Sequence, residues 1–210
     1  FSMMLDLIFE TTNDKDVYIK YFETMQKEYE FWMDGSEKTD KGCAVKRVVK
    51  TKSGDILNRY YDDENKPRPE SYMIDVKDAK ISGNPEFFRN IRAACESGWD
   101  FSSRWFKDGE TIQNIQTLDF AQVDLNCLLW HLESTLSKTA KLKGDPDLEK
   151  KYGDFAVKRK YNIQKYFWDH EDGIYKDFDF QNNKVTPSEH IAALYPLFFE
   201  LSTKHQAEDV

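Results

Sequence analysis

Residues Val123 to Leu136 read VDLNCLLWHLESTL and carry the clearest helical pattern in the chain. Leucines recur there at i, i+3, i+4, i+7 and i+11, at positions Leu125, Leu128, Leu129, Leu132 and Leu136. This spacing places them on one face of an α-helix, which predicts that the leucine face is buried. Asp124 and Asn126 lie in the first turn, where either residue can cap the helix or support a neighbouring site.

Similar apolar stripes predict further helices on both sides of this stretch. They cover residues 2–12, 14–33, 72–80, 84–96, 145–167 and 188–202. Asp145 with Pro146 should start the helix at 145–167, and Gly98 should end the helix at 84–96. Pro196 falls inside the last range and should kink or delay that helix. Two β-prone runs around Lys52 to Asp55 predict a hairpin within residues 43–61, and residues 173–180 predict a strand. Long helices with small hairpins and no βαβ alternation indicate an all-α fold.

Composition excludes several classes of function. A chain of 210 residues, of which 40% are hydrophobic, is long enough to bury a sizeable core. The formal net charge of −8 argues against nucleic acid, whose phosphates require a basic face. No apolar run approaches the length that spans a bilayer. The cysteines, Cys43, Cys95 and Cys127, lack the spacing of a metal site, and free thiols are favoured over a disulfide.

The stretch from Glu96 to Phe106, ESGWDFSSRWF, carries the strongest signal for chemistry. It places Asp100 between the rings of Trp99 and Phe101. A carboxylic acid enclosed by aromatic surface is desolvated, which raises its pKa toward the value that a general acid needs near neutral pH. The C-terminus of the preceding helix should also favour the protonated acid. From composition alone, a helix cap or an ion pair with Arg104 is an equal alternative for this aspartate.

The motif PRPESY at Pro67 to Tyr72 predicts a stiff, extended loop. Pro67 and Pro69 fix φ on both sides of Arg68 and should exclude helix there. Because side chains of an extended chain alternate with period two, Arg68 and Glu70 are expected to point the same way. A local ion pair between them is the structural alternative, although at a surface it would stabilise the protein by only ~0 to 1 kcal/mol.

ESGWDFSSRWF, PRPESY and VDLN occur in the order and at the spacing of the trehalase family of inverting glycoside hydrolases, which the chain resembles over nearly its whole length. Two signatures of that family, PGGRF and QWD-x-P, do not occur in the chain. We therefore expect residues 1–210 to be a partial catalytic domain without its N-terminal and C-terminal signature regions. The resemblance implies about half of an (α/α)6 barrel with small β-hairpin insertions, which should leave apolar helix faces exposed.

The same resemblance implies roles for individual residues. Asp100 matches the catalytic acid, Arg68 and Glu70 match positions that hydrogen-bond sugar hydroxyls, and Gly98 matches a backbone position that lines the same pocket. The base of the family is a Glu that would lie beyond Val210, so the chain alone is expected to be inactive. The implied reaction is hydrolysis of α,α-trehalose to two glucose molecules, with no cofactor and no metal.

Two functions of other classes are compatible with the same residues. An inactive sugar-binding relic would keep Arg68 and Glu70 and bind trehalose without releasing glucose. A helical scaffold for protein partners would bind no sugar and would depend on its exposed helix faces. Arg104 is a further candidate for the sugar site that the resemblance implies.

Overall fold

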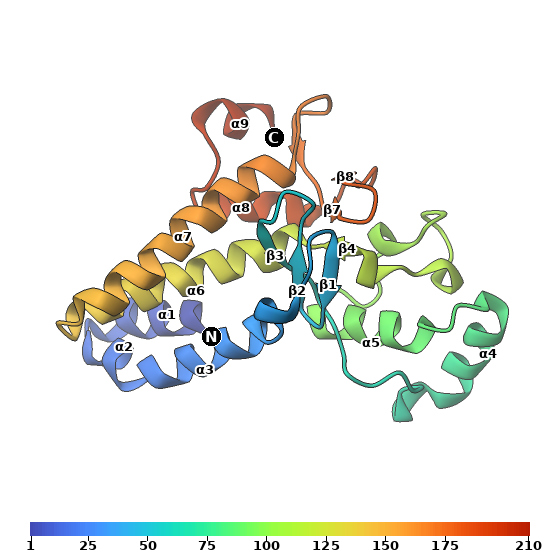
Figure 1. Ribbon diagram of the computed structural model, residues 1–210, viewed down its shortest axis with the longest axis horizontal. Helices are drawn as coiled ribbons and strands as arrows, with labels where there is room; N and C mark the ends of the chain where they lie inside the picture. Colours follow the sequence, from blue (N-terminus) through green and yellow to red (C-terminus); the bar gives the residue numbers. More distant parts are fainter.

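The computed structural model describes the whole chain, Phe1–Val210. Its longest elements, α6 (Val123–Leu142) and α7 (Pro146–Tyr166), form an antiparallel hairpin (Figure 1). The backbone N–H of Leu148 donates to the side chain of Asp145, which caps α7 as predicted. Both helices therefore lie where the apolar periodicity predicts them.

The N-terminal helices α1 (Ser2–Thr12), α2 (Asp16–Lys20) and α3 (Phe22–Met33) pack along α6. The prediction of one helix over residues 14–33 is wrong, because Tyr21 has φ −104° and ψ 14° and separates α2 from α3. The change of direction at this residue allows both helices to reach α6. Their inward side chains share a core with the leucine face of α6, which includes Leu5, Phe22, Met25, Tyr29, Leu125, Leu129, Leu132 and Leu136.

A three-stranded antiparallel sheet of β1 (Cys43–Val45), β2 (Val48–Lys50) and β3 (Ile56–Asn58) follows α3. The sequence predicts only one hairpin within residues 43–61. An additional turn, in which Lys46 has a positive φ of 49°, divides the first predicted run into two strands. The fully buried side chains of this sheet are Val48, Val49, Leu57 and Asn58.

Helices α4 (Tyr72–Ser82) and α5 (Phe87–Ser97) form the other half of the molecule, on the right in Figure 1. Both end at a glycine in the left-handed conformation, Gly83 and Gly98 respectively. The apolar face of α5 lies in a small core with residues after it in the chain: Phe87, Ile91, Ala94, Trp105, Ile115 and Phe120. By contrast, α4 exposes Tyr72, Met73, Ile74 and Ile81. This confirms the expectation that the chain leaves apolar helix faces exposed.

Short strands connect the two halves. They are β4 (Phe120–Ala121), β5 (Trp168–Asp169), β6 (Ile174–Tyr175), β7 (Phe178–Asp179) and β8 (Lys184–Val185). A second sheet has the order β4-β7-β8, and β5 pairs with β6. The strand predicted over residues 173–180 is therefore interrupted at Lys176 and Asp177, and its two parts belong to different sheets.

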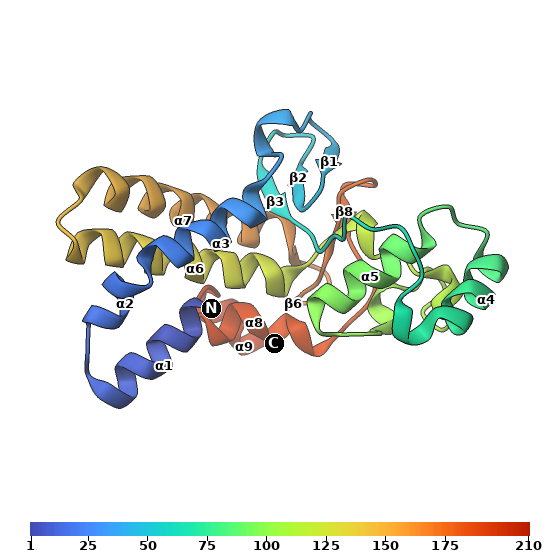
Figure 2. The same ribbon diagram turned by 90° about the horizontal axis from the view of Figure 1, so that it is seen from below.

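The C-terminal segment differs most from the prediction. In place of one helix over residues 188–202 there is a 3₁₀ turn, η6 (Ile191–Leu194), and one turn of helix, α8 (Tyr195–Phe198). Pro196 lies in the first turn of α8, where its missing N–H is tolerated. The final helix, α9 (Lys204–Asp209), was not predicted, although it begins with a capping box. Figure 2 shows α8 between α1 and the half that contains α4 and α5.

The loops contain 3₁₀ turns in addition to η6. These are η1 (Ser36–Lys38), η2 (Pro69–Ser71), η3 (Ser103–Trp105), η4 (Ile112–Asn114) and η5 (Thr117–Asp119). Two of them, η2 and η3, lie in the PRPESY and ESGWDFSSRWF stretches, so both motifs adopt compact and defined backbone conformations.

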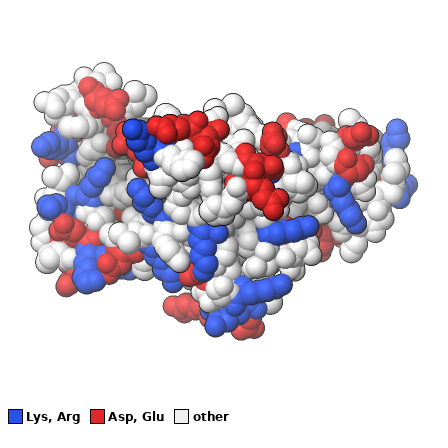
Figure 3. Space-filling view, turned by 90° about the horizontal axis from the view of Figure 1, so that it is seen from above, with Lys and Arg blue, Asp and Glu red and all other residues white.

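The surface and the thiols agree with the composition. All three cysteines are free: Cys43 is exposed, Cys95 is partly buried and Cys127 is buried. Acidic and basic side chains are intermixed on the face drawn in Figure 3, which shows no continuous basic stripe. None of the helices combines the length and the apolar character that crossing a bilayer demands.

Candidate active site

Asp100 lies in the loop that follows α5, and its side chain is exposed. Gly98 ends α5 with φ 75°, as the sequence predicts, and so redirects the chain into this loop. The carboxylate of Asp100 forms no hydrogen bond or ion pair within the chain, which rules out the helix cap and the pair with Arg104 as its role here. Asp100 therefore has no structural partner in the chain.

The predicted enclosure of Asp100 by its neighbouring rings is wrong for these residues. Trp99 is partly buried and donates its indole N–H to Asp124 Oδ2 at 2.8 Å. Phe101 instead covers the guanidinium of Arg68, whose carbon lies 4.8 Å from the ring centroid. Asp100 is exposed beside both rings, so they do not enclose its carboxylate.

Behind the loop, Arg104 is buried with only 4% of its surface exposed. Its Nη2 lies 3.2 Å from Asp124 Oδ1, and its Nε lies 3.4 Å from Asp177 Oδ2. Asp177 also accepts hydrogen bonds from the indole N–H of Trp105 and the backbone N–H of Val123, at 3.3 and 3.0 Å. Arg104 thus joins the loop to the start of α6 and to the segment between β6 and β7.

His190 completes this buried network. Its Nδ1 lies 3.1 Å from Arg104 Nη1, and its Nε2 lies 3.8 Å from Asp177 Oδ2. Burial lowers the pKa of His190 below its ordinary value, and the nearby arginine acts in the same direction while Asp177 opposes it. A neutral imidazole can accept a hydrogen bond from the guanidinium through Nδ1.

Arg68 lies next to the same loop but pairs with a residue that the sequence analysis did not identify. Asp75, on α4, accepts from Arg68 Nε at 3.0 Å and from Nη2 at 2.7 Å. These hydrogen bonds raise the pKa of the Arg68 guanidinium. The predicted alternative of an ion pair with Glu70 is therefore wrong, although the contact with Phe101 does bring PRPESY and ESGWDFSSRWF together.

Glu70 is exposed and has no hydrogen-bond partner in the chain. The prolines keep Arg68 extended, with φ −68° and ψ 137°, as predicted. Pro69 nevertheless begins the 3₁₀ turn η2, because the first residue of such a turn needs no N–H donor. The period-two argument therefore does not apply to Arg68 and Glu70. Gly98 is exposed too, with open space around its Cα, so its backbone is accessible from solvent.

Comparisons with known proteins agree with these motifs. The family model for Trehalase matches residues 1–210. The periplasmic trehalase of Escherichia coli O139:H28 is 39% identical over 210 residues, which are 99% of this chain and 37% of that protein. The periplasmic trehalase of Salmonella typhimurium strain LT2 is also 39% identical, over 100% of this chain and 37% of its own length.

The chain belongs to the trehalase family. Among solved structures, neutral trehalase Nth1 from Saccharomyces cerevisiae superposes with a TM-score of 0.73 at 22% identity, over 99% of this chain and 42% of that one. This likeness confirms the predicted fold, an all-α arrangement that forms part of an (α/α)6 barrel. A sialidase matches more distantly, with a TM-score of 0.58 at 14% identity over 94% of this chain and 13% of its own. The chain spans little more than a third of the curated trehalases that it matches.

Asp124 and Asn126, in the VDLN motif, have different roles in this member of the trehalase family. Asp124 contacts Trp99 and Arg104, so it supports the loop rather than capping α6. Asn126 accepts from the backbone N–H of Asn58 at 3.1 Å and donates to its carbonyl at 2.9 Å, so it holds β3. The sequence left open whether Asp124 caps the helix or supports a neighbouring site, and the structure favours support of the neighbouring loop.

Some residues of this candidate site had no sequence signal. Asp177 lies 54 residues after Val123 and 72 residues after Trp105, whereas Asp75 lies only seven residues after Arg68. No periodicity or motif marks either aspartate. Glu96 is quoted in the motif, yet its role was missed: it accepts from Arg47 Nε and from the backbone N–H of Tyr61, each at 2.9 Å. Burial raises the pKa of Glu96, and the hydrogen bond from Arg47 opposes that change.

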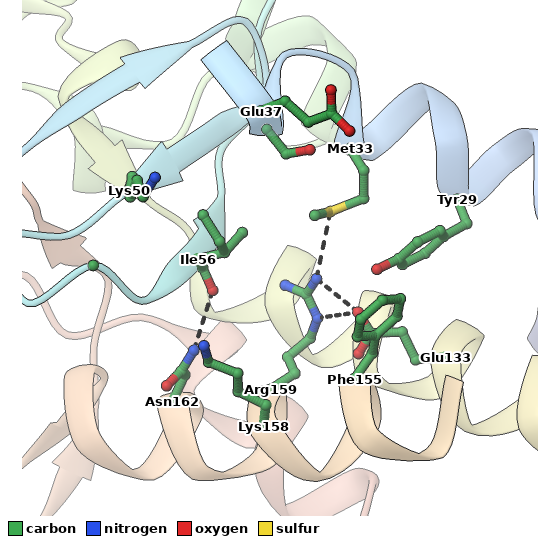
Figure 4. Close-up of a pocket in the computed structure, with 12 residues that line it drawn as sticks. Tyr29, Met33, Glu37, Lys50, Ile56, Glu133, Phe155, Lys158, Arg159 and Asn162 are labelled. Atoms are coloured by element: carbon green, nitrogen blue, oxygen red, sulfur yellow. Dashed lines mark hydrogen bonds and ion pairs between the residues drawn. The ribbon is translucent and has the colours of Figure 1, made fainter. Parts of the chain in front are cut away.

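A cavity of about 370 Å³ lies apart from this loop, between α3, the first sheet and α7 (Figure 4). At its base Arg159 Nη2 pairs with Glu133 Oε1 at 2.8 Å. Tyr29 and Phe155 stack at its wall with ring centroids 5.8 Å apart. None of the predicted site residues lines this cavity, and no group of three or more His, Cys, Asp and Glu side chains in the chain is arranged to hold a metal ion.

Proposed function

We propose that these residues form the acid-bearing part of an enzyme that hydrolyses α,α-trehalose to two glucose molecules with inversion. The observation that carries the proposal is the exposed, unpartnered carboxylate of Asp100 in a loop whose tryptophans are anchored on both sides. Trp99 is held by Asp124, and Trp105 is held by Asp177. A fixed backbone around a free carboxylate is the arrangement that proton transfer to a bound substrate requires.

An inverting glycosidase uses two carboxyl groups, typically ~6.5 to 9.5 Å apart, on opposite sides of the scissile bond. We assign to Asp100 the acid that protonates the leaving oxygen. The base, which activates water on the other face, is proposed to be a Glu outside residues 1–210, because the trehalases that this chain matches extend well beyond it. The chain by itself is then inactive.

Arg68, Glu70 and Gly98 complete the proposed sugar site. Asp75 accepts from Nε and Nη2 of Arg68, and Cys95 Sγ accepts from Nη1, which leaves one N–H on each of Nη1 and Nη2 for a sugar hydroxyl. The Glu70 carboxylate has no partner in the chain, so its oxygens can accept from hydroxyls. The backbone of Gly98 lies open beside the acid. Trehalose is neutral, so recognition by paired donors and acceptors needs neither a metal nor a cofactor.

The test is glucose release from trehalose by the longest reading frame that contains these residues, compared with its Asp100→Asn variant. Loss of a general acid lowers turnover by about 100-fold or more. Asp63→Asn is a matched control, because Asp63 is also exposed and its carboxylate also has no partner. Near-normal release by Asp100→Asn contradicts the assignment of the acid.

A parent protein that releases no glucose contradicts the proposed reaction itself. Calorimetry with trehalose then separates the two other functions. Binding without turnover indicates a sugar-binding relic, whereas no binding indicates a helical scaffold, whose partner would depend on exposed faces such as that of α4.

A further inference from the structure

Asp75 is a buried acid that the function proposed above does not use. Only 2% of its surface is exposed, yet it is surrounded by the donors of one residue, Arg68. Asp75 Oδ2 accepts from the backbone N–H of Arg68 at 2.9 Å and from Nε at 3.0 Å, and Oδ1 accepts from Nη2 at 2.7 Å. These contacts fix the backbone and the side chain of Arg68 at the same time.

The rest of the Arg68 guanidinium is constrained as well. One face is covered by the ring of Phe101 at 4.8 Å, and Nη1 lies 3.6 Å from Cys95 Sγ. A guanidinium is planar, so a bidentate carboxylate on one edge and a ring on one face determine its orientation. Phe101 is the residue next to Asp100, so the position of this plane also bears on the acid loop.

We propose that Asp75 is a positioning residue that aims Arg68 at the sugar and, through the stacking of Arg68 on Phe101, sets the position of the Asp100 loop. This inference rests on the proposed function. It explains why a charged residue is buried in α4, a helix whose other face exposes apolar side chains: the acid satisfies a cation that must keep its remaining donors free. Removal of the acid allows the guanidinium to turn away from the sugar.

Asp78, one turn further along α4, provides a matched control. Its Oδ1 accepts from Gln113 Nε2 at 2.8 Å, and it contacts neither Arg68 nor Phe101. Asp75→Asn and Asp78→Asn are therefore the same chemical change on the same helix, and only the first alters the support of Arg68.

The experiment measures kcat, KM and thermal stability for glucose release by the parent protein and both variants. A displacement of about 1 Å in a positioned group can cost about 100-fold, so Asp75→Asn should lower kcat/KM by about 10- to 100-fold. KM should rise because Arg68 no longer faces the sugar, and kcat should fall because the Asp100 loop shifts. Asp78→Asn should retain the parent value. Wild-type kinetics in a folded Asp75→Asn protein overturn the inference, whereas absence of glucose release in the parent overturns the proposed function and this inference with it.

A double variant separates positioning from a purely structural role. If Asp75 acts through Arg68, the loss caused by Asp75→Asn should nearly vanish in an Arg68→Lys background, because interacting residues are not additive. Equal losses in both backgrounds overturn the inference. Phe101→Leu removes the ring without burying a charge, and its loss of activity should also nearly vanish in the Arg68→Lys background. This variant replaces Asp75→Asn in the test if Asp75→Asn does not fold.

Discussion

Arg104 and Arg159 are equally buried, with 4% and 5% of their surfaces exposed, but they belong to regions with different purposes. Arg159 lies on α7 and pairs with Glu133 of α6, so its ion pair holds two long helices together (Figure 4). Arg104 lies in a loop and pairs with Asp124 and Asp177. Both regions bury charged groups away from water, yet only the region of Arg104 lies directly beside an exposed acid, Asp100.

The difference shows that a buried ion pair does not by itself mark a functional site. The Arg159 network continues to Asn58 and Asn126, both of which are fully buried. The Arg104 network continues to Trp99 and Trp105, which flank a carboxylate without a partner. The informative feature is therefore the free group that a network supports, and the variants below test that distinction.

The largest effect is expected from Glu133→Gln. It leaves the cation of Arg159 in the interior without a charged partner, which should lower the free energy of unfolding by about 3 to 5 kcal/mol. Chemical denaturation measures this change, and kcat/KM of the folded fraction should stay at the parent value. Glu149→Gln, which removes an exposed pair with Lys141, should cost only ~0 to 1 kcal/mol. A kinetic defect in folded Glu133→Gln contradicts the distinction between the two regions.

Asp124→Asn should have a smaller effect on stability and a larger one on activity. Asp177 still pairs with Arg104, so the cost should be about 1 to 3 kcal/mol from weakened hydrogen bonds. Trp99 loses its charged acceptor and the loop shifts, which should lower kcat by about 10- to 100-fold. Denaturation and glucose-release assays on the same preparation check both. Normal kcat together with lower stability shows that Trp99 does not position Asp100.

Gly98→Ala and Gly83→Ala form a matched pair. Both glycines end helices with positive φ, 75° and 65°, and neither has an atom within 4 Å of an added Cβ. The backbone penalty should therefore be similar, about 1 kcal/mol in each case. Only Gly98→Ala should also lower kcat/KM, because it lies two residues from Asp100. Thermal melts and kinetics of both variants measure this, and equal kinetics would place Gly98 outside the sugar site.

The smallest effect concerns pH. Burial holds the folded-state pKa of His190 below 6.5, so the unfolded chain takes up a proton more readily than the folded one. The stability that depends on neutral His190 is present above about pH 6.5 and is lost as the pH falls from there toward the lower folded-state pKa. His190→Gln should therefore give a shallower fall in the free energy of unfolding between about pH 7 and 5.

Denaturation curves at several pH values measure the slope for His190→Gln. His205→Gln is the control, since the side chain of His205 is 85% exposed and contacts no part of the buried network. If His190→Gln leaves the pH dependence of the free energy of unfolding unchanged, the effects on the pKa of His190 cancel. Asp177 and Asp124, which raise this pKa, would then balance burial and Arg104, which lower it.

Elements with local signals can be predicted from the sequence alone. Leucine spacing predicts α6, Asp145 with Pro146 predicts the start of α7, and Gly98 predicts the end of α5. Each of these depends on neighbours within about four residues, through helical periodicity and capping. The motifs also identified the family, and with it the fold, because their order along the chain is a property of the sequence alone.

The three-dimensional packing of the chain sets which charges meet and which stay free. It pairs Arg68 with Asp75 and Arg104 with Asp124 and Asp177, and it leaves the Asp100 carboxylate exposed. It also divides residues 14–33 and 188–202 into shorter pieces, because packing against α6 outweighs helical propensity. Ion pairs form between elements that the fold brings together, so the partner of a buried charge is set by three-dimensional proximity and carries no local pattern in the sequence.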